Sequence, residues 1–130
     1  MLCGITQDPT PTTLTNYINC IYVQKQVNYV QQWQPLIQAH FLPKDQQRAL
    51  QIIYCESRGK PNAVGINKDQ TRDVGLWQFN DHTWAWLKNK LKFTGNRYDP
   101  VLSTKVARWL IYNDGWHHWY SSKHCWLKNF

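Results

Sequence analysis

The run Cys-Glu-Ser-Arg-Gly-Lys-Pro-Asn-Ala-Val, residues 55–64, marks the point where a helix is expected to end and a turn-rich segment to begin. Pro43 suits the first turn of a helix from about Lys44 to Ser57, and Gly59 and Pro61 suit its end. The inner face of this helix would hold Ala49, Leu50, Ile52, Ile53 and Tyr54.

Glu56 is the only glutamate in the chain, and it falls at the C-terminal end of this helix. There the helix dipole disfavours an anion by about 0.3–1 kcal/mol. Partial burial and the negative helix end both raise the pKa of a carboxyl group, as a general acid at neutral pH requires. A surface or capping role is the alternative.

The remaining pattern predicts a mainly helical α+β chain with one small β region. Helices are expected over residues 14–33, in one or two pieces with an amphipathic pattern, and over 81–91 and 99–113. Residues 60–74 suit a hairpin or irregular β region, 75–80 a buried stretch, 92–98 a loop, and 116–130 an irregular or weakly helical end. Val101, Val106, Trp109 and Leu110 would face inward, and core packing is favoured for Trp84, Trp86 and Trp109.

The 130 residues suit a single domain, which can bury roughly two thirds of its unfolded surface. The net charge of +7 comes entirely from residues 44–130 and suits an anionic partner, which could be nucleic acid, an anionic membrane or an anionic cell wall. The basic residues are scattered, with no nucleic-acid motif around the densest group at Lys88, Lys90 and Lys92. We expect neither nucleic-acid binding nor membrane insertion, and a monomer.

The chemistry-bearing residues near the C-terminus do not form a known metal motif. His117, His118, His124 and Cys125 lie close together, but their spacing matches no known zinc site, so no metal or cofactor is expected. The four cysteines allow two disulfides in three possible pairings, or four buried thiols. Residues 1–15 lack the basic start and apolar run of a signal peptide, so we expect a mature secreted or periplasmic form, or delivery by a phage or virion.

Three motifs in order carry a family resemblance over roughly residues 33–126. The run 55–64 and the segment Gly-Leu-Trp-Gln-Phe-Asn at 75–80 resemble soluble lytic transglycosylases and goose-type lysozymes. The ending Gly-Trp-His-His-Trp at 115–119 resembles that of resuscitation-promoting factors and related phage domains. The resemblance implies a lysozyme-like fold that cleaves peptidoglycan glycan strands, with Glu56 as general acid. Residues 1–32 have no clear counterpart and would form a helical extension.

Asp73, 17 residues after Glu56, is the candidate second carboxylate. In animal c-type lysozymes an Asp precedes a similar segment at this spacing and serves as nucleophile or charge stabiliser, a well-known example of paired catalytic carboxylates. The resemblance to transglycosylases implies instead that the 6-hydroxyl of the muramyl sugar attacks internally. A turn-forming Asp73 that pairs with Arg72 at the surface is the structural alternative.

The same resemblance implies further site residues. Substrate contacts are expected from Ser57, Gln78, Asn80, Trp77, Tyr112, Asn113, Trp116 and Trp119. For Gln78 and Asn80 the alternative is hydrogen bonding to buried backbone, and for Ser57 the structural role is favoured. In resuscitation-promoting factors a Cys before the catalytic Glu pairs with one near the C-terminus, which implies Cys55–Cys125 and leaves Cys3 with Cys20. A non-catalytic wall-binding or virion module remains the alternative function.

Overall fold

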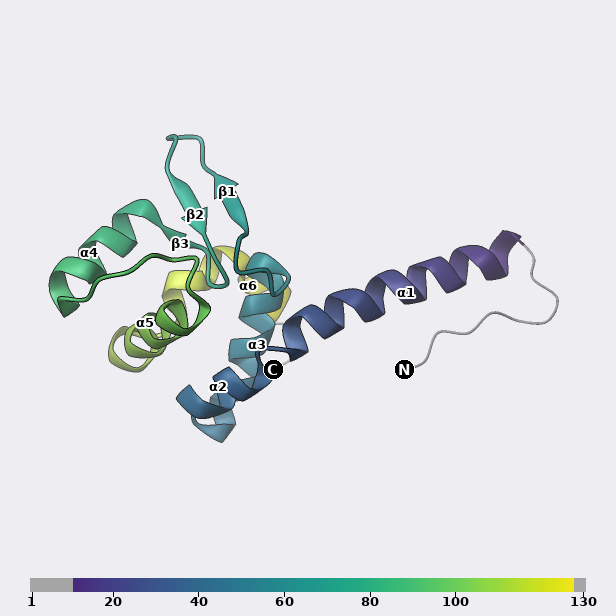
Figure 1. The fold of residues 1–130 in the computed structure, drawn as a ribbon, viewed down its shortest axis with the longest axis horizontal. Helices are drawn as coiled ribbons and strands as arrows, with labels where there is room; N and C mark the ends of the chain where they lie inside the picture. The colour runs from purple at the N-terminus through teal and green to yellow at the C-terminus, as the bar shows by residue number, and fades with distance from the viewer. Residues whose placement is uncertain (1–10, 128–130) are drawn as a thin grey trace.

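The helix that ends at Glu56 and Ser57 lies at the centre of the fold, where four other helices contact it (Figure 1). The structure is a computed structural model that describes residues 11–127, apart from some side chains between residues 11 and 28. Its elements are α1 (Pro11–Gln31), α2 (Gln34–His40), α3 (Pro43–Ser57), β1 (Val64–Ile66), β2 (Arg72–Val74), β3 (Phe79–Asn80), α4 (Asp81–Leu91), α5 (Pro100–Asp114), the 3₁₀ helix η1 (Trp116–Ser122) and α6 (Lys123–Trp126). The predicted mainly helical α+β class is confirmed.

The predicted course of α3 is confirmed, and its end has a clear cause. Arg58 adopts a left-handed conformation (φ 55°) and its guanidinium donates a hydrogen bond to the carbonyl of Tyr54. Gly59 follows with φ 79°, and a side chain there would approach the Tyr29 carbonyl oxygen to 2.6 Å. A glycine is therefore needed where the end of α3 passes α1. Tyr54 is 37% exposed, so its predicted inward position is wrong.

The predicted β region is an antiparallel sheet of order β1-β2-β3. Asp73 lies in the central strand β2, opposite Gly65 on β1 and Asn80 on β3. The stretch 75–80 is mostly buried as expected, but the pattern did not predict that its last two residues add a third strand. The sheet thus brings Asp73 next to Asn80.

The core lies between α3, the sheet end and α5, and tryptophans fill much of it. Trp77 is fully buried and its indole donates a hydrogen bond to Thr104 Oγ1 on α5. The core position of Trp84 is confirmed, but Trp86 is 47% exposed and Val101, in the first turn of α5, is 44% exposed. The predicted inward positions of these two residues are wrong. In α4 the buried residues form one narrow stripe that leaves out Trp86, and in α5 the buried residues begin only at Ser103, after Val101.

α1 extends away from the rest of the molecule, as Figure 1 shows. A helix was predicted here, but not this exposure: among the α1 side chains that the structure describes, Ile18 and Tyr22 are each 63% exposed. The short helix α2 was not predicted. Pro35 lies in its first turn, where proline is tolerated because an N–H at that position would have no helical partner.

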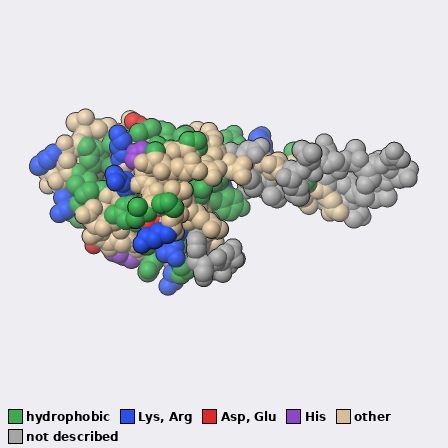
Figure 2. Space-filling model, turned by 90° about the horizontal axis from the view of Figure 1, so that it is seen from below, with side chains coloured by type: hydrophobic (Ala, Val, Ile, Leu, Met, Phe, Trp, Pro, Cys, Tyr) green, Lys and Arg blue, Asp and Glu red, His purple; other side chains and the backbone are tan. Residues whose placement is uncertain are grey.

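A disulfide ties α6, the last described helix, to the central helix α3. Cys55 of α3 and Cys125 of α6 form a disulfide with a Cα–Cα distance of 6.0 Å, as the resemblance implied. Cys20 is also disulfide-bonded, and its expected partner, Cys3, lies outside the described residues. Within residues 11–127 no helix combines the length and apolarity of a membrane span. On the face in Figure 2, Lys and Arg side chains are dispersed rather than gathered in one patch.

Candidate active site

Both candidate carboxylates line one pocket of about 210 Å³. Its walls come from α3, the sheet, α4, α5 and η1. Two other hollows are larger, about 460 and 490 Å³, but no carboxylate among the described residues lines either one. Of the predicted site residues, this pocket brings together Glu56, Asp73, Trp77, Gln78, Asn80 and Trp119.

Glu56 occupies the last turn of α3, with its side chain partly buried. The hydroxyl of Ser122 donates a hydrogen bond to Glu56 Oε1 at 2.8 Å. Burial raises the pKa of Glu56, the Ser122 hydrogen bond opposes this by lowering it, and the negative charge of Asp73 raises it further. The net effect is a raised pKa, which favours a protonated carboxyl group able to act as an acid.

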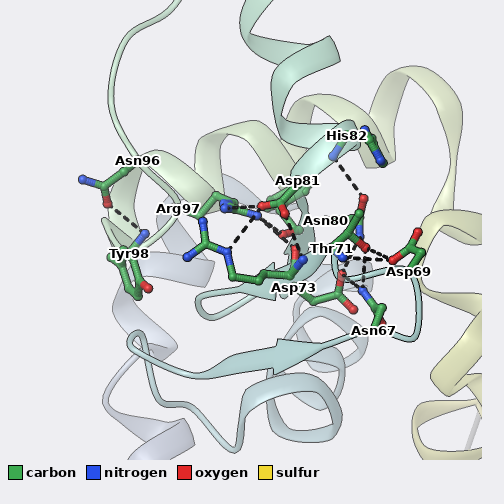
Figure 3. Close-up of polar contacts among 12 residues, drawn as sticks. Asn67, Asp69, Thr71, Asp73, Asn80, Asp81, His82, Asn96, Arg97 and Tyr98 are labelled. Atoms are coloured by element: carbon green, nitrogen blue, oxygen red, sulfur yellow. Dashed lines mark hydrogen bonds and ion pairs between the residues drawn. The ribbon is translucent and has the colours of Figure 1, made fainter.

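Asp73 is held in place by two side-chain amides (Figure 3). Asn67 Nδ2 donates to Asp73 Oδ1 at 3.1 Å, and Asn80 Nδ2 donates to the same oxygen at 2.9 Å. The suggested pairing of Asp73 with Arg72 is wrong. The backbone N–H of Arg72 donates to Asp81 Oδ2 at 2.9 Å, and its guanidinium lies 4.0 Å from the same carboxylate.

The amides of Asn80 and Gln78 are engaged within the protein. Asn80 Nδ2 donates to Thr71 Oγ1 as well as Asp73, and its Oδ1 accepts from the His82 N–H at the start of α4. Gln78 Nε2 donates to the carbonyls of Ala63 and Gly75, each at 3.0 Å. The Gln78 bonds match the alternative of hydrogen bonding to backbone, whereas Asn80 bonds two side chains and one backbone N–H; both residues also line the pocket.

The aromatic lining is formed by buried rings. Trp77 and Trp119 are 0% and 4% exposed and meet edge to face at 5.5 Å between centroids. The Trp119 indole donates to the backbone carbonyl of Trp77 at 2.9 Å. Because little of either ring is exposed, their faces form the pocket wall more than an open stacking platform.

Four predicted contacts lie elsewhere. Ser57 is buried and donates to the Ile53 carbonyl at 3.0 Å, the structural role favoured for it. Tyr112 and Asn113 line the 490 Å³ hollow, and the Tyr112 hydroxyl donates to Asp45 Oδ2 at 2.8 Å. Trp116 packs near Trp126, with the Arg48 guanidinium 5.3 Å from its ring centroid. The structure does not bring these four to the pocket.

Seven residues at the site were not anticipated. Phe79, Thr83, Leu110 and Ser121 are part of the pocket lining. Ser122 bonds Glu56, Asn67 bonds Asp73, and His118 lines the pocket. A signal for Ser122 existed: the disulfide implied between Cys55 and Cys125 places the residues just before Cys125 beside Glu56. Asn67 carried no such signal, because its contact depends on the hairpin register.

Two substitutions at the site should move the pH profile in opposite directions. Ser122→Ala removes the hydrogen bond that lowers the Glu56 pKa, so the alkaline limb of the glycan cleavage that the family resemblance implies should move to higher pH. Asp73→Asn removes the negative charge that raises this pKa, so the alkaline limb of its remaining activity should move to lower pH. The measurement is the initial rate on solubilised peptidoglycan across the pH range. Shifts in the same direction would contradict this electrostatic account.

Comparison with known proteins gives one family match. The family model described as Transglycosylase SLT domain matches residues 42–115, from just before α3 to the end of α5. This segment holds both carboxylates and leaves out α1, α2, η1 and α6. No curated protein and no solved structure matches the chain.

Proposed function

Because the chain belongs to the family of transglycosylase SLT domains, we propose that it cleaves the β-1,4 bond between N-acetylmuramic acid and N-acetylglucosamine in peptidoglycan by lytic transglycosylation. The observation that carries the proposal is Glu56, a partly buried carboxyl group with a raised pKa in a pocket shared with Asp73. A net charge of +7 favours approach to an anionic cell wall. We further propose that the protein acts there as a monomer, outside the cytoplasm.

In the proposed reaction Glu56 works first as acid and then as base. Its proton passes to the glycosidic oxygen as the bond from that oxygen to the muramyl anomeric carbon breaks. The muramyl 6-hydroxyl then bonds the same carbon, and its proton returns to the Glu56 carboxylate. Ser122 Oγ lies 2.8 Å from Glu56 and 3.1 Å from the Trp119 carbonyl oxygen, and one hydroxyl proton can serve only one of them. It would donate to Glu56 when that group is ionised and to Trp119 when it is protonated.

Asp73 would stabilise the positive charge that develops on the sugar ring. Its Oδ1 accepts two amide hydrogen bonds, which fix the carboxylate on the pocket wall. Asn67 and Asn80 are therefore proposed as positioning residues. Contacts to sugar hydroxyls or N-acetyl groups remain proposals for Gln78 and Asn80, and sugar contacts remain proposals for Trp77 and Trp119; all four line the same pocket.

Hydrolysis is the second candidate, favoured by the presence of Asp73 in the pocket of Glu56. A retaining hydrolase uses such a pair at a separation of roughly 5–5.5 Å, with the second carboxylate as nucleophile and water as final acceptor. Mass spectrometry of the digestion products separates the two reactions. We expect 1,6-anhydro muramyl ends, which are lighter by one water than hydrolysed ends. Free reducing ends throughout would contradict transglycosylation and support the lysozyme reaction.

A further inference from the structure

Three ligand-type side chains converge where α5 ends and η1 begins. The ligating atoms of Asp114, His117 and His118 all lie within 4.8 Å of one another. His118 Nε2 lies 2.6 Å and His117 Nε2 3.4 Å from the same oxygen, Asp114 Oδ2. The Nε2 atoms of two different imidazoles thus both approach one carboxylate oxygen, whereas an ordinary Asp–His pair contains a single histidine.

The backbone between these residues suits the cluster. Gly115 has φ +106°, which turns the chain from α5 into η1, and its N–H donates to the carbonyls of Leu110 and Ile111. A side-chain carbon at Gly115 would lie 3.4 Å from His117 Nδ1, an ordinary contact distance, so the His117 ring lies directly against this turn. The turn therefore holds His117 beside Asp114.

Two imidazole nitrogens and one carboxylate form a donor set that suits zinc and the later divalent transition metals. We propose that Asp114, His117 and His118 bind one such ion. Zinc bonds of about 2.0–2.1 Å in tetrahedral geometry put neighbouring ligand atoms roughly 3.3 Å apart. The His117–Asp114 distance of 3.4 Å already fits, and the His118–Asp114 distance of 2.6 Å must widen.

The side chains can make that adjustment, because those of Asp114 and His117 are 50% and 52% exposed. The same exposure leaves water free to complete the coordination, as in zinc sites with three protein ligands.

The position of the ion connects it to the pocket. His118 is both a ligand of the proposed site and part of the pocket wall with Glu56. A bound ion would add positive charge and bulk at the pocket edge, so zinc is expected to slow glycan cleavage. This consequence rests on the proposed function, whereas the binding site does not.

The test is a titration of tag-free, disulfide-intact protein with Zn²⁺ against a coloured zinc indicator, without peptidoglycan. We expect one equivalent bound, with affinity reduced at least about tenfold in His117→Ala and in Asp114→Asn. His124→Ala is the matched control, because His124 is a nearby exposed histidine on α6 outside the cluster, and it should bind as the parent does.

Absence of binding by the parent protein, or equal binding by His117→Ala and the parent, would overturn the site. Zinc inhibition of cleavage that is lost in His117→Ala would support the link to the pocket, and inhibition that persists there would overturn that link. A protein that binds zinc but cleaves no glycan would contradict the proposed function alone.

Discussion

Glu56→Gln should lower the rate of peptidoglycan solubilisation by at least about a hundredfold, since positioned general acids contribute about 10²–10⁴-fold. Gln keeps the size of the side chain and can still accept the hydrogen bond from Ser122, but it has no proton to give to the glycosidic oxygen. The rate is followed as the fall in turbidity of a purified cell-wall suspension. A non-catalytic wall-binding module would bind the wall but leave its turbidity unchanged, even with Glu56 intact.

Two controls accompany this variant. Asp45→Asn changes a carboxylate near the start of the same helix, outside the Glu56 pocket, and should retain most activity.

The fold of Glu56→Gln should persist. Because the folded-state pKa of Glu56 is raised, its contribution to stability is present below the unfolded pKa and is lost as pH rises through the folded pKa. A neutral Gln avoids that loss, so its thermal midpoint at neutral pH should equal or exceed that of the parent. Near-parental cleavage by Glu56→Gln would refute the general-acid role.

Replacing both Cys55 and Cys125 by Ser should lower the free energy of unfolding by about 4 kcal/mol. The bridge spans 70 positions, and closing a loop of that length removes roughly this much entropy from the unfolded chain. The cleavage rate should also fall. The bridge ties α6 to α3, and Ser122, which ends η1 just before α6, bonds Glu56. Denaturant unfolding measures the first effect, and the cleavage rate below the unfolding transition measures the second.

The matched control replaces Cys3 and Cys20, the other expected pair. Cys20 lies on α1, which extends away from the rest of the molecule (Figure 1) and supplies none of the residues that line the Glu56 pocket, so this variant should keep its cleavage rate. If the Cys55/Cys125 variant unfolded at the parental denaturant concentration, the bridge would have no stabilising role. If both double variants lost activity equally, the proposed link between the bridge and Glu56 would be wrong.

Features set by local sequence could be predicted. Pro43 and the segment after Ser57 bound α3, and helical spacing oriented Ala49, Ile52 and Ile53 toward the core. Glu56 then followed as an acid on an unfavourable helix end, and the motif order identified the hairpin and Asp73. The Cys55–Cys125 bridge came from resemblance, because four cysteines alone leave three pairings open.

Features that depend on distant contacts could not be predicted. Ser122 meets Glu56 across 66 positions, and Tyr112 bonds Asp45 across 67, so Tyr112 lies away from the pocket. The pattern also could not tell which apolar helix residues would find a partner, since Trp86 follows helical spacing yet stays exposed. The amides of Gln78 and Asn80 are directed by the fold of the sheet, which spacing alone does not specify.

The most direct test counts the new glycan ends made in one peptidoglycan preparation by the parent protein and by Glu56→Gln, using mass spectrometry. The predicted result is new muramyl ends from the parent in 1,6-anhydro form, and almost none from Glu56→Gln. Equal numbers of new ends from the two proteins, or cleavage confined to the peptide stems, would contradict the assignment of Glu56 as the acid that breaks the glycan strand.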